Sequence, residues 1–190
     1  TEIYALSLHD ALPILASKVH ISDYHVTAIP NSDYSQATVE ASINLCNTGL
    51  KAVKNLRVVM QLNPASDQDG SARTLQESVR KLTAGDTVTV RLTCSIDKPL
   101  LWSAEKPNLY DSSIELADEH FDNHFGVKRV ECVGEVFKIN GKNVKLRGVN
   151  RHDHHPKTGR YVDDATYEED IRLMKQANIN FLRTSHYPDR

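Results

Sequence analysis

The hydrophobic pattern of the chain changes its period once, after Gly134, and this change limits the possible folds more than any other feature. Before Gly134, short runs alternate or cluster β-branched and apolar residues, which is the pattern of strands. After Gly134 the pattern is that of strand, loop, helix and strand. The sequence therefore predicts a β domain followed by the beginning of an α/β domain.

The first part contains a series of short predicted strands separated by turn residues. The clearest runs are 38–46, 56–63, 87–96 and 111–117, and the sequences between them include "NTG", "PASDQDG" (64–70) and "TAGD". About 100 residues of this kind suit a two-sheet sandwich of immunoglobulin type.

The cysteines do not complete the immunoglobulin pattern. Cys46 and Cys94 are separated by about the interval of an immunoglobulin disulfide, but Trp102 follows both of them instead of lying between them. We therefore expect no disulfide there. The three cysteines are odd in number and form no C-x-x-C, so neither a zinc ribbon nor a disulfide-rich scaffold is supported.

The second part begins with a predicted hairpin. In "VFKINGKNVKL" (136–146), Asn140-Gly141 stands between two alternating runs, which is the strongest short hairpin signal. We expect the second strand of this hairpin to continue as far as Asn150.

A helix and a further strand follow. "TYEEDIRLMKQAN" (166–178) predicts a helix with Thr166 and Glu169 as a capping box and Asn178 at the left-handed C-terminal stop. Residues 179–186 predict the next strand. Strand, helix and strand in this order form a βαβ unit with a parallel sheet, whose ligands gather at the C-terminal ends of the strands.

Composition and charge exclude several classes of protein. The chain is 39% hydrophobic and 25% charged, which is typical of a soluble globular protein. A formal net charge of -2 gives no field for collecting nucleic acid or an anionic membrane, and no apolar run approaches the roughly 18 residues of a membrane span. We expect neither nucleic acid nor a membrane as a partner.

The first 14 residues, "TEIYALSLHDALPI", fit neither a clean helix nor a clean strand. They lack the basic segment and cleavage site of a secretory signal. The expected compartment is the cytoplasm, although the residues that would decide it lie outside this chain. They resemble a translated sequencing adapter, and we interpret residues 1–14 as a leader foreign to the fold. The alternative is a native leader strand.

Several motifs in order and at matching spacing carry a resemblance to a known family. They are "ISDYHV" (21–26), "LWSAEKPNLY" (101–110), "INGKNVKLRGVNRHDHHP" (139–156), "DIRLMKQANIN" (170–180) and "RTSHYPD" (183–189). The chain resembles glycoside hydrolase family two, and in particular its bacterial lactose-cleaving β-galactosidases. Within that family, "NRHDHHP" favours galactosidases over glucuronidases.

The resemblance implies an immunoglobulin-like β-sandwich at residues 15–132, followed at residues 133–190 by the first β-α-β segment of a (β/α)8 TIM barrel. A closed barrel needs eight strands and about 250 residues. We therefore expect a fragment of a retaining β-galactosidase that hydrolyses terminal β-D-galactose from substrates such as lactose. The alternative is a non-enzymatic sandwich module that binds carbohydrate or protein.

The resemblance also implies roles for three residues. His152 and His186 match histidines that line the galactose pocket and donate hydrogen bonds to sugar hydroxyls. Arg183 matches an arginine that supports the nucleophilic carboxylate. Retaining glycosidases use two carboxyl groups, and the family's two catalytic glutamates would lie beyond residue 190, so we expect this chain alone to be inactive.

The other acidic and histidine residues receive structural interpretations. Asp153, His154 and His155 are interpreted as residues that shape a loop, because no second Cys/His cluster accompanies them to complete a metal site. The carboxylates at 163, 164 and 168–170 straddle a helix start, where capping is the expected role. No cofactor is expected in this fragment, whereas the resemblance implies Mg and Na, and a homo-oligomer, for the longer enzyme.

Overall fold

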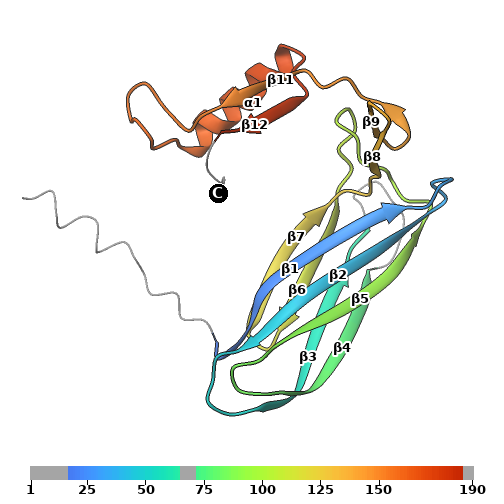
Figure 1. Cartoon of the computed structure of the whole chain (residues 1–190), viewed down its shortest axis with the longest axis vertical. Helices are drawn as coiled ribbons and strands as arrows, with labels where there is room; N and C mark the ends of the chain where they lie inside the picture. The colour runs from blue at the N-terminus through green and yellow to red at the C-terminus, as the bar shows by residue number, and fades with distance from the viewer. Residues whose placement is uncertain (1–16, 65–71, 186–190) are drawn as a thin grey trace, which may run out of the picture. The chain divides into compact units, whose positions relative to one another are not determined.

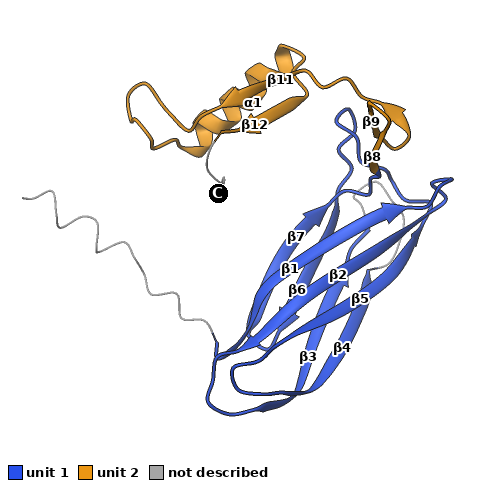
Figure 2. Ribbon diagram, viewed as in Figure 1, with its two compact units in different colours: residues 1–129 blue, residues 130–190 orange. Residues whose placement is uncertain are grey.

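The computed structural model describes residues 17–64 and 72–185. The leader assigned to residues 1–14, most of the turn at 64–70, and His186 lie outside the described residues. The chain divides into two compact units, residues 1–129 and 130–190 (Figure 2). Each unit is described by itself below.

The first unit is a sandwich of two antiparallel sheets (Figure 1). The three-stranded sheet has the order β1-β2-β5, and the four-stranded sheet has the order β4-β3-β6-β7. The strands are β1 (Val19–Pro30), β2 (Gln36–Asn47), β3 (Val53–Leu62), β4 (Arg73–Leu82), β5 (Thr87–Asp97), β6 (Tyr110–Leu116) and β7 (Glu119–Phe125). The predicted two-sheet sandwich is confirmed, and all four predicted strands are present as β2, β3, β5 and β6.

Alternation of side chains builds the core of the sandwich. Along β2, Val39, Ala41, Ile43 and Leu45 are buried while their neighbours are partly or fully exposed. Apolar residues of the facing sheet, such as Met60 and Ile114, are equally buried. The two inner faces therefore pack against each other as the period of two predicts.

Tyr110 brings a buried, hydrogen-bonded hydroxyl group into this core. Its ring stacks on Phe125 with a centroid separation of 5.7 Å, and its hydroxyl oxygen accepts a hydrogen bond from the backbone N–H of Leu100 at 2.9 Å. Burial raises the pKa of Tyr110, and the hydrogen bond from Leu100 opposes this shift. The hydroxyl is thus buried with a partner, as a tyrosine in a core requires.

Cys46 and Cys94 are both free thiols in the structure. They lie in the same sheet, where Cys46 pairs with Thr87 and Cys94 pairs with Val39. Residues 39 and 46 of one strand are about 23 Å apart at the usual strand rise. That separation is far beyond the reach of a disulfide.

The second unit opens with a small antiparallel sheet of order β10-β9-β8. Its strands are β8 (Val130–Val133), β9 (Val136–Ile139) and β10 (Lys142–Asn143). Asn140 and Gly141 have φ values of 50° and 73°, which are those of the predicted two-residue turn. The hairpin is confirmed.

The expected continuation of the hairpin strand to Asn150 is wrong. β10 ends at Asn143, and residues 148–151 form a separate strand, β11 (Gly148–Arg151), in a different sheet. β11 pairs in parallel with β12 (Phe181–Thr184), and α1 (Asp164–Gln176) connects the two. The predicted βαβ unit is therefore present, but it begins at Gly148.

The N-terminus of α1 differs from the predicted capping box. The N-cap is Asp163, whose Oδ1 accepts hydrogen bonds from the N–H of Thr166 at 2.9 Å and from its Oγ1 at 2.5 Å. Glu169 instead binds Arg172, with 2.8 Å between Arg172 Nε and Glu169 Oε2. Aspartate is as good an N-cap as threonine, and the N-cap therefore lies three residues earlier than predicted.

The C-terminus of α1 is as predicted. Asn178 has a φ of 57°, and its N–H donates to the carbonyl of Lys175 at 3.0 Å. The N–H of Ile179 donates to the carbonyl of Met174 at 2.9 Å. These two bonds form a Schellman motif, which ends the helix and directs the chain into β12.

Candidate functional site

The parallel strands β11 and β12 present two different faces. Arg151 pairs with Thr184, and Asn150 pairs with Arg183. Paired residues of neighbouring strands share a face, and successive residues alternate between faces. Arg151 therefore lies on the face that α1 covers, and Arg183 lies on the opposite face.

The same alternation places His152 with Arg183. His152 follows the last residue of β11, and the N–H of Ser185 donates to the carbonyl of Arg151 at 3.0 Å, which extends the ladder by one step. His152 is thus on the side of Asn150 and Arg183, away from the helix. All three are exposed. The structure therefore brings two of the three predicted site residues to one face at the C-terminal ends of adjacent strands, while His186 is outside the described residues.

On the helix side, the Arg151 guanidinium binds two carboxylates. Its Nε donates to Asp170 Oδ2 at 2.9 Å, and its Nη1 donates to Asp153 Oδ1. The guanidinium carbon also lies 4.4 Å from the centre of the Tyr167 ring. We call these four residues, Arg151, Asp153, Tyr167 and Asp170, the Arg151 cluster.

Burial and the neighbouring carboxylates shift the pKa of Arg151 in opposite directions. Burial by itself would lower the pKa of Arg151, but the hydrogen bonds to Asp170 and Asp153 outweigh it and raise the pKa. Burial raises the pKa of Tyr167, and the neighbouring Asp153 carboxylate raises it further. The guanidinium is therefore held firmly in its charged form.

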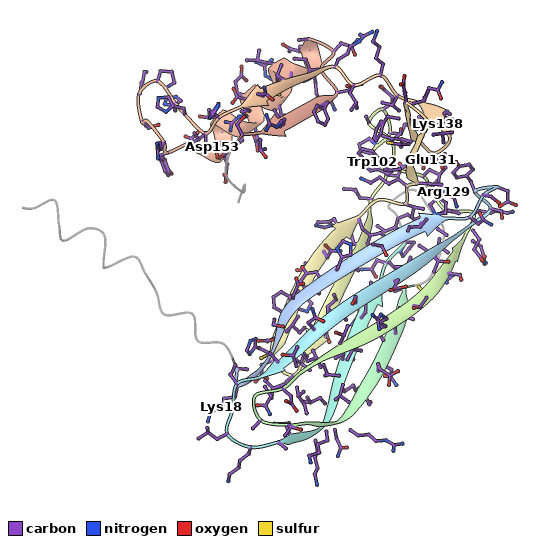
Figure 3. All side chains as sticks on the ribbon, in the orientation of Figure 1. Lys18, Trp102, Arg129, Glu131, Lys138 and Asp153 are labelled. Carbon is purple, nitrogen blue, oxygen red and sulfur yellow. The ribbon has the colours of Figure 1, made fainter. Side chains whose placement is uncertain are left out.

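The loop between β11 and α1 is organised around His155 and the Arg151 cluster. Figure 3 shows Asp153 in this loop. The N–H of His155 donates to the carbonyl of Gly159 at 2.7 Å, and the N–H of Gly159 donates back to His155 at 3.0 Å. His155 Nδ1 accepts from the N–H groups of Lys157 and Thr158, both at 3.3 Å. These contacts support the interpretation of His155 as a loop-shaping residue.

Among residues 17–64 and 72–185, no three His, Cys, Asp or Glu side chains converge in a way that could hold a metal ion. The Mg and Na that the resemblance implies for a longer enzyme stay a prediction. We derive no step of the reaction through a metal.

Within residues 17–64 and 72–185, no helix is long and apolar enough to cross a bilayer.

A hollow of about 420 Å³ lies between α1 and the helix-facing side of the strands. Its walls include Arg151, Tyr167, Ile171, Leu182 and Thr184. The hollow is on the side of the sheet opposite His152 and Arg183. It therefore borders the Arg151 cluster but is separate from the predicted sugar pocket.

Comparison with known families identifies both units. Residues 19–128 match the family model described as glycosyl hydrolases family 2, and residues 130–190 match the model described as the TIM barrel domain of the same family. The first match alone covers more than half of the chain. The chain belongs to glycosyl hydrolase family 2. The βαβ segment is accordingly the start of a (β/α)8 barrel, and the predicted fold class is confirmed.

Several solved structures resemble the chain over nearly its whole length. A β-glucuronidase from Bacteroides uniformis, in covalent complex with cyclophellitol-6-carboxylate aziridine, is 25% identical with a TM-score of 0.74 and covers 91% of this chain and 22% of its own. A proposed β-galactosidase from Bacteroides fragilis is 21% identical with a TM-score of 0.77, covering 92% and 27% respectively.

A β-galacturonidase from Eisenbergiella tayi, bound to galacturonate, is 20% identical with a TM-score of 0.71 and covers 91% of this chain and 29% of its own. The chain thus spans less than a third of each of these three proteins. The three names refer to three different sugars, so this likeness supports the fold, and the choice of sugar is treated below as a proposal.

The sequence alone does not reveal the Arg151 cluster. It shows Arg151 as one basic residue beside a histidine-rich loop, and Asp170 as one of several carboxylates near a helix start. One signal was present: Tyr167, Asp170, Ile171 and Met174 recur at the spacing of a single helix face. A carboxylate on an otherwise apolar face requires a partner, and that requirement points to a nearby cation.

Proposed function

We propose that the chain is the sandwich and first barrel segment of a retaining β-galactosidase, in which it supplies one wall of the sugar pocket. The observation that carries this proposal is the strand register at the C-terminal ends of β11 and β12, which by alternation puts His152 and Arg183 on the same face, opposite α1. In a TIM barrel the face opposite the helices is the barrel interior, and the C-terminal ends of the strands surround the active site.

His152 is proposed as a donor of hydrogen bonds to sugar hydroxyls. Such bonds strengthen as the ring flattens toward an oxocarbenium ion, so they contribute to catalysis only when the donor is held in place. His186 is proposed to contribute in the same way from the next strand end. Rigid strand ends suit this role because they fix donors better than free loops do.

Arg183 is proposed to support the carboxylate that acts as the nucleophile. A guanidinium next to a carboxylate keeps it ionised through charge-assisted hydrogen bonds. In a retaining mechanism this carboxylate attacks the anomeric carbon, while a carboxylic acid about 5–5.5 Å away protonates the leaving oxygen. We place both carboxyl groups beyond residue 190, on later strands of a longer protein.

Galactose is proposed as the sugar on the basis of the loop sequence "NRHDHHP" (150–156). The test is a comparison of kcat/KM for the 4-nitrophenyl β-glycosides of galactose, glucuronic acid and galacturonic acid, with a longer protein that contains this chain. We expect the galactoside to be preferred by at least about 100-fold, because a site built to bind a neutral hydroxymethyl group leaves a carboxylate unpaired. A preference for either uronide would refute the proposal that galactose is the substrate sugar, and the assignment to family 2 would stand.

A further inference from the structure

We propose that Arg151 is a positioning residue for His152, acting by fastening the β11–α1 loop to helix α1. This inference rests on the proposed function of His152. Arg151 itself faces away from the proposed sugar pocket, so its effect on the reaction would be exerted entirely through its neighbour in the chain.

The two residues that flank His152 in the chain are bonded to each other. Arg151 precedes His152, and Asp153, which accepts a hydrogen bond from Arg151 Nη1, follows it. The backbone at residue 152 is thereby held in a closed turn between two bonded side chains. The turn is reinforced by the N–H of His154, which donates to the carbonyl of His152 at 2.9 Å.

The same guanidinium anchors this turn to a rigid element. Its Nε donates to Asp170 in the second turn of α1, and its central carbon lies 4.4 Å from the centre of the Tyr167 ring one turn earlier. The Arg151 side chain is only 11% exposed, although most side chains around it are open to solvent. A charge this well covered needs its partners, so the cluster fixes the loop more strongly than an exposed ion pair could.

The cluster is specific for arginine. The planar fork of the guanidinium can donate to two carboxylates and stack on an aromatic ring at the same time. A lysine ammonium is a point charge without a plane. Arg151→Lys therefore keeps the positive charge but loses the planar fork. This variant shows whether the role of Arg151 depends on the geometry of its bonds or only on its charge.

The first test follows the loop itself, in the 190-residue chain, by amide hydrogen exchange at His154 and His155. We expect Arg151→Ala to accelerate exchange at both amides by about tenfold or more relative to the rest of the second unit. Arg172→Ala is the matched control, because it removes an exposed arginine that binds Glu169 on the same helix. Arg151→Lys serves if the alanine variant does not fold, and it should also accelerate exchange. Unchanged exchange in the Arg151 variants would overturn the proposal.

The second test measures the reaction, in a longer protein that contains this chain. We expect Arg151→Ala to lower kcat by about 100-fold with little change in KM, since a misplacement near 1 Å has that effect on a catalytic constellation. Millimolar guanidinium should restore part of the lost kcat, because the emptied space adjoins the hollow beside α1. His152→Ala should lose activity without such rescue.

The two tests separate the two proposals. If the longer protein does not cleave β-galactosides, the proposed function fails, and the exchange measurement still decides whether Arg151 holds the loop. If the longer protein is active, and kcat is unchanged in Arg151→Ala or falls equally in Arg172→Ala, the positioning role is refuted and the proposed function stands.

Discussion

The side chain of Asn47 joins two loops of the sandwich. It is fully buried, and its Nδ2 donates to the carbonyls of Lys51, Leu82 and Thr83 at 3.0, 3.1 and 3.1 Å. Its Oδ1 accepts from the N–H of Gly49 at 3.0 Å. One buried side-chain amide thus holds backbone groups of residues 49, 51, 82 and 83.

We expect Asn47→Ala to lower the free energy of unfolding by roughly 2–4 kcal/mol, because several buried backbone groups lose their partner at once. Urea denaturation of the 190-residue chain would measure the change. Asn44→Ala, which removes a single bond from Thr89 Oγ1 at 2.7 Å, is the control and should cost about 0.5 kcal/mol. Equal effects in the two variants would contradict this account of Asn47.

Single residues also show what the sequence could and could not reveal. The left-handed positions of Asn140 and Asn178 were predicted, because their residue types and neighbours determine the turn locally. The partners of Asn47 and Arg151 were not, because each binds groups from segments distant in the sequence. A hydrophobic pattern carries no information about which distant polar group a side chain will meet.

At the scale of elements, Gly148 is essential to the pairing of β11 with β12. A Cβ atom at Gly148 would lie 2.5 Å from Phe181 Cδ1 and 2.9 Å from the Phe181 carbonyl oxygen. The side chain could turn away, but the carbonyl belongs to the neighbouring strand. The close approach of the two strands therefore depends on the missing side chain.

We predict that Gly148→Ala destabilises the β11–β12 pair by about 2 kcal/mol through this overlap. Hydrogen exchange at the paired amides of residues 148–151 and 181–184 would report the loss as faster exchange. Asn150→Ala alters an exposed residue of the same strand and should leave exchange nearly unchanged. Protection that survives in Gly148→Ala would show that the strands can separate slightly at no cost.

The N-terminus of α1 should respond to acid. Hydrogen bonds from the side chain and backbone of Thr166 lower the pKa of Asp163 below its ordinary value of 3.8. A carboxyl group with a lowered pKa in the folded state stabilises that state above its ordinary pKa, and this contribution is lost as the pH falls through the lowered value. The helix start should therefore loosen only below about pH 4.

An NMR titration of the Thr166 amide would follow this loss directly. We expect its chemical shift to move as the pH falls below about 4 and to report a midpoint below 3.8. Asp163→Asn keeps a capping oxygen without the charge, so its Thr166 amide should not titrate. A midpoint above 3.8 in the unaltered chain would contradict the assigned cap.

The elements themselves were largely predictable, and their boundaries less so. The predicted strands of the sandwich, the hairpin and the helix depend on local periodicity, and all are present. The alternation does contain a sign of the break between β10 and β11, because Val144 and Leu146 keep a period of two that Gly148 and Val149 do not continue. The two strands also pair with different partners, β10 with β9 and β11 with β12, and pairing between distant segments is not visible in the sequence.

At the scale of the whole molecule, the two units differ in how well their apolar side chains are covered. The first unit contains the contiguous core, whereas α1 has no buried residue and Phe181, Ile171 and Leu173 are each 45–51% exposed. Stability within a chain follows the number of buried contacts. The second unit should therefore open much more readily than the first.

We predict that amides of residues 133–190 exchange much faster than those of the sandwich strands in the 190-residue chain. Hydrogen exchange followed by mass spectrometry would compare peptides from the two units under the same conditions. The buried strand β2 supplies an internal reference for slow exchange. Equal protection in both units would refute this difference in stability.

The 190-residue chain is also predicted to lack hydrolytic activity, because neither of the two carboxyl groups required for retaining hydrolysis is assigned to it. Incubation with a chromogenic β-galactoside should give no release above the buffer rate. Turnover that disappears in His186→Ala would contradict this prediction, since it would require a complete site within these residues.

The most direct test of the central claim, that this chain forms a sugar-binding wall of a family 2 active site, is the effect of His152→Ala on kcat in a longer protein that contains it. We predict a fall of about 10²–10³ for a β-galactoside, the usual effect of removing one donor to developing charge. His154→Ala, in the same loop, should change kcat less than about threefold. An unchanged kcat in His152→Ala would contradict the claim that this part of the chain contacts the sugar.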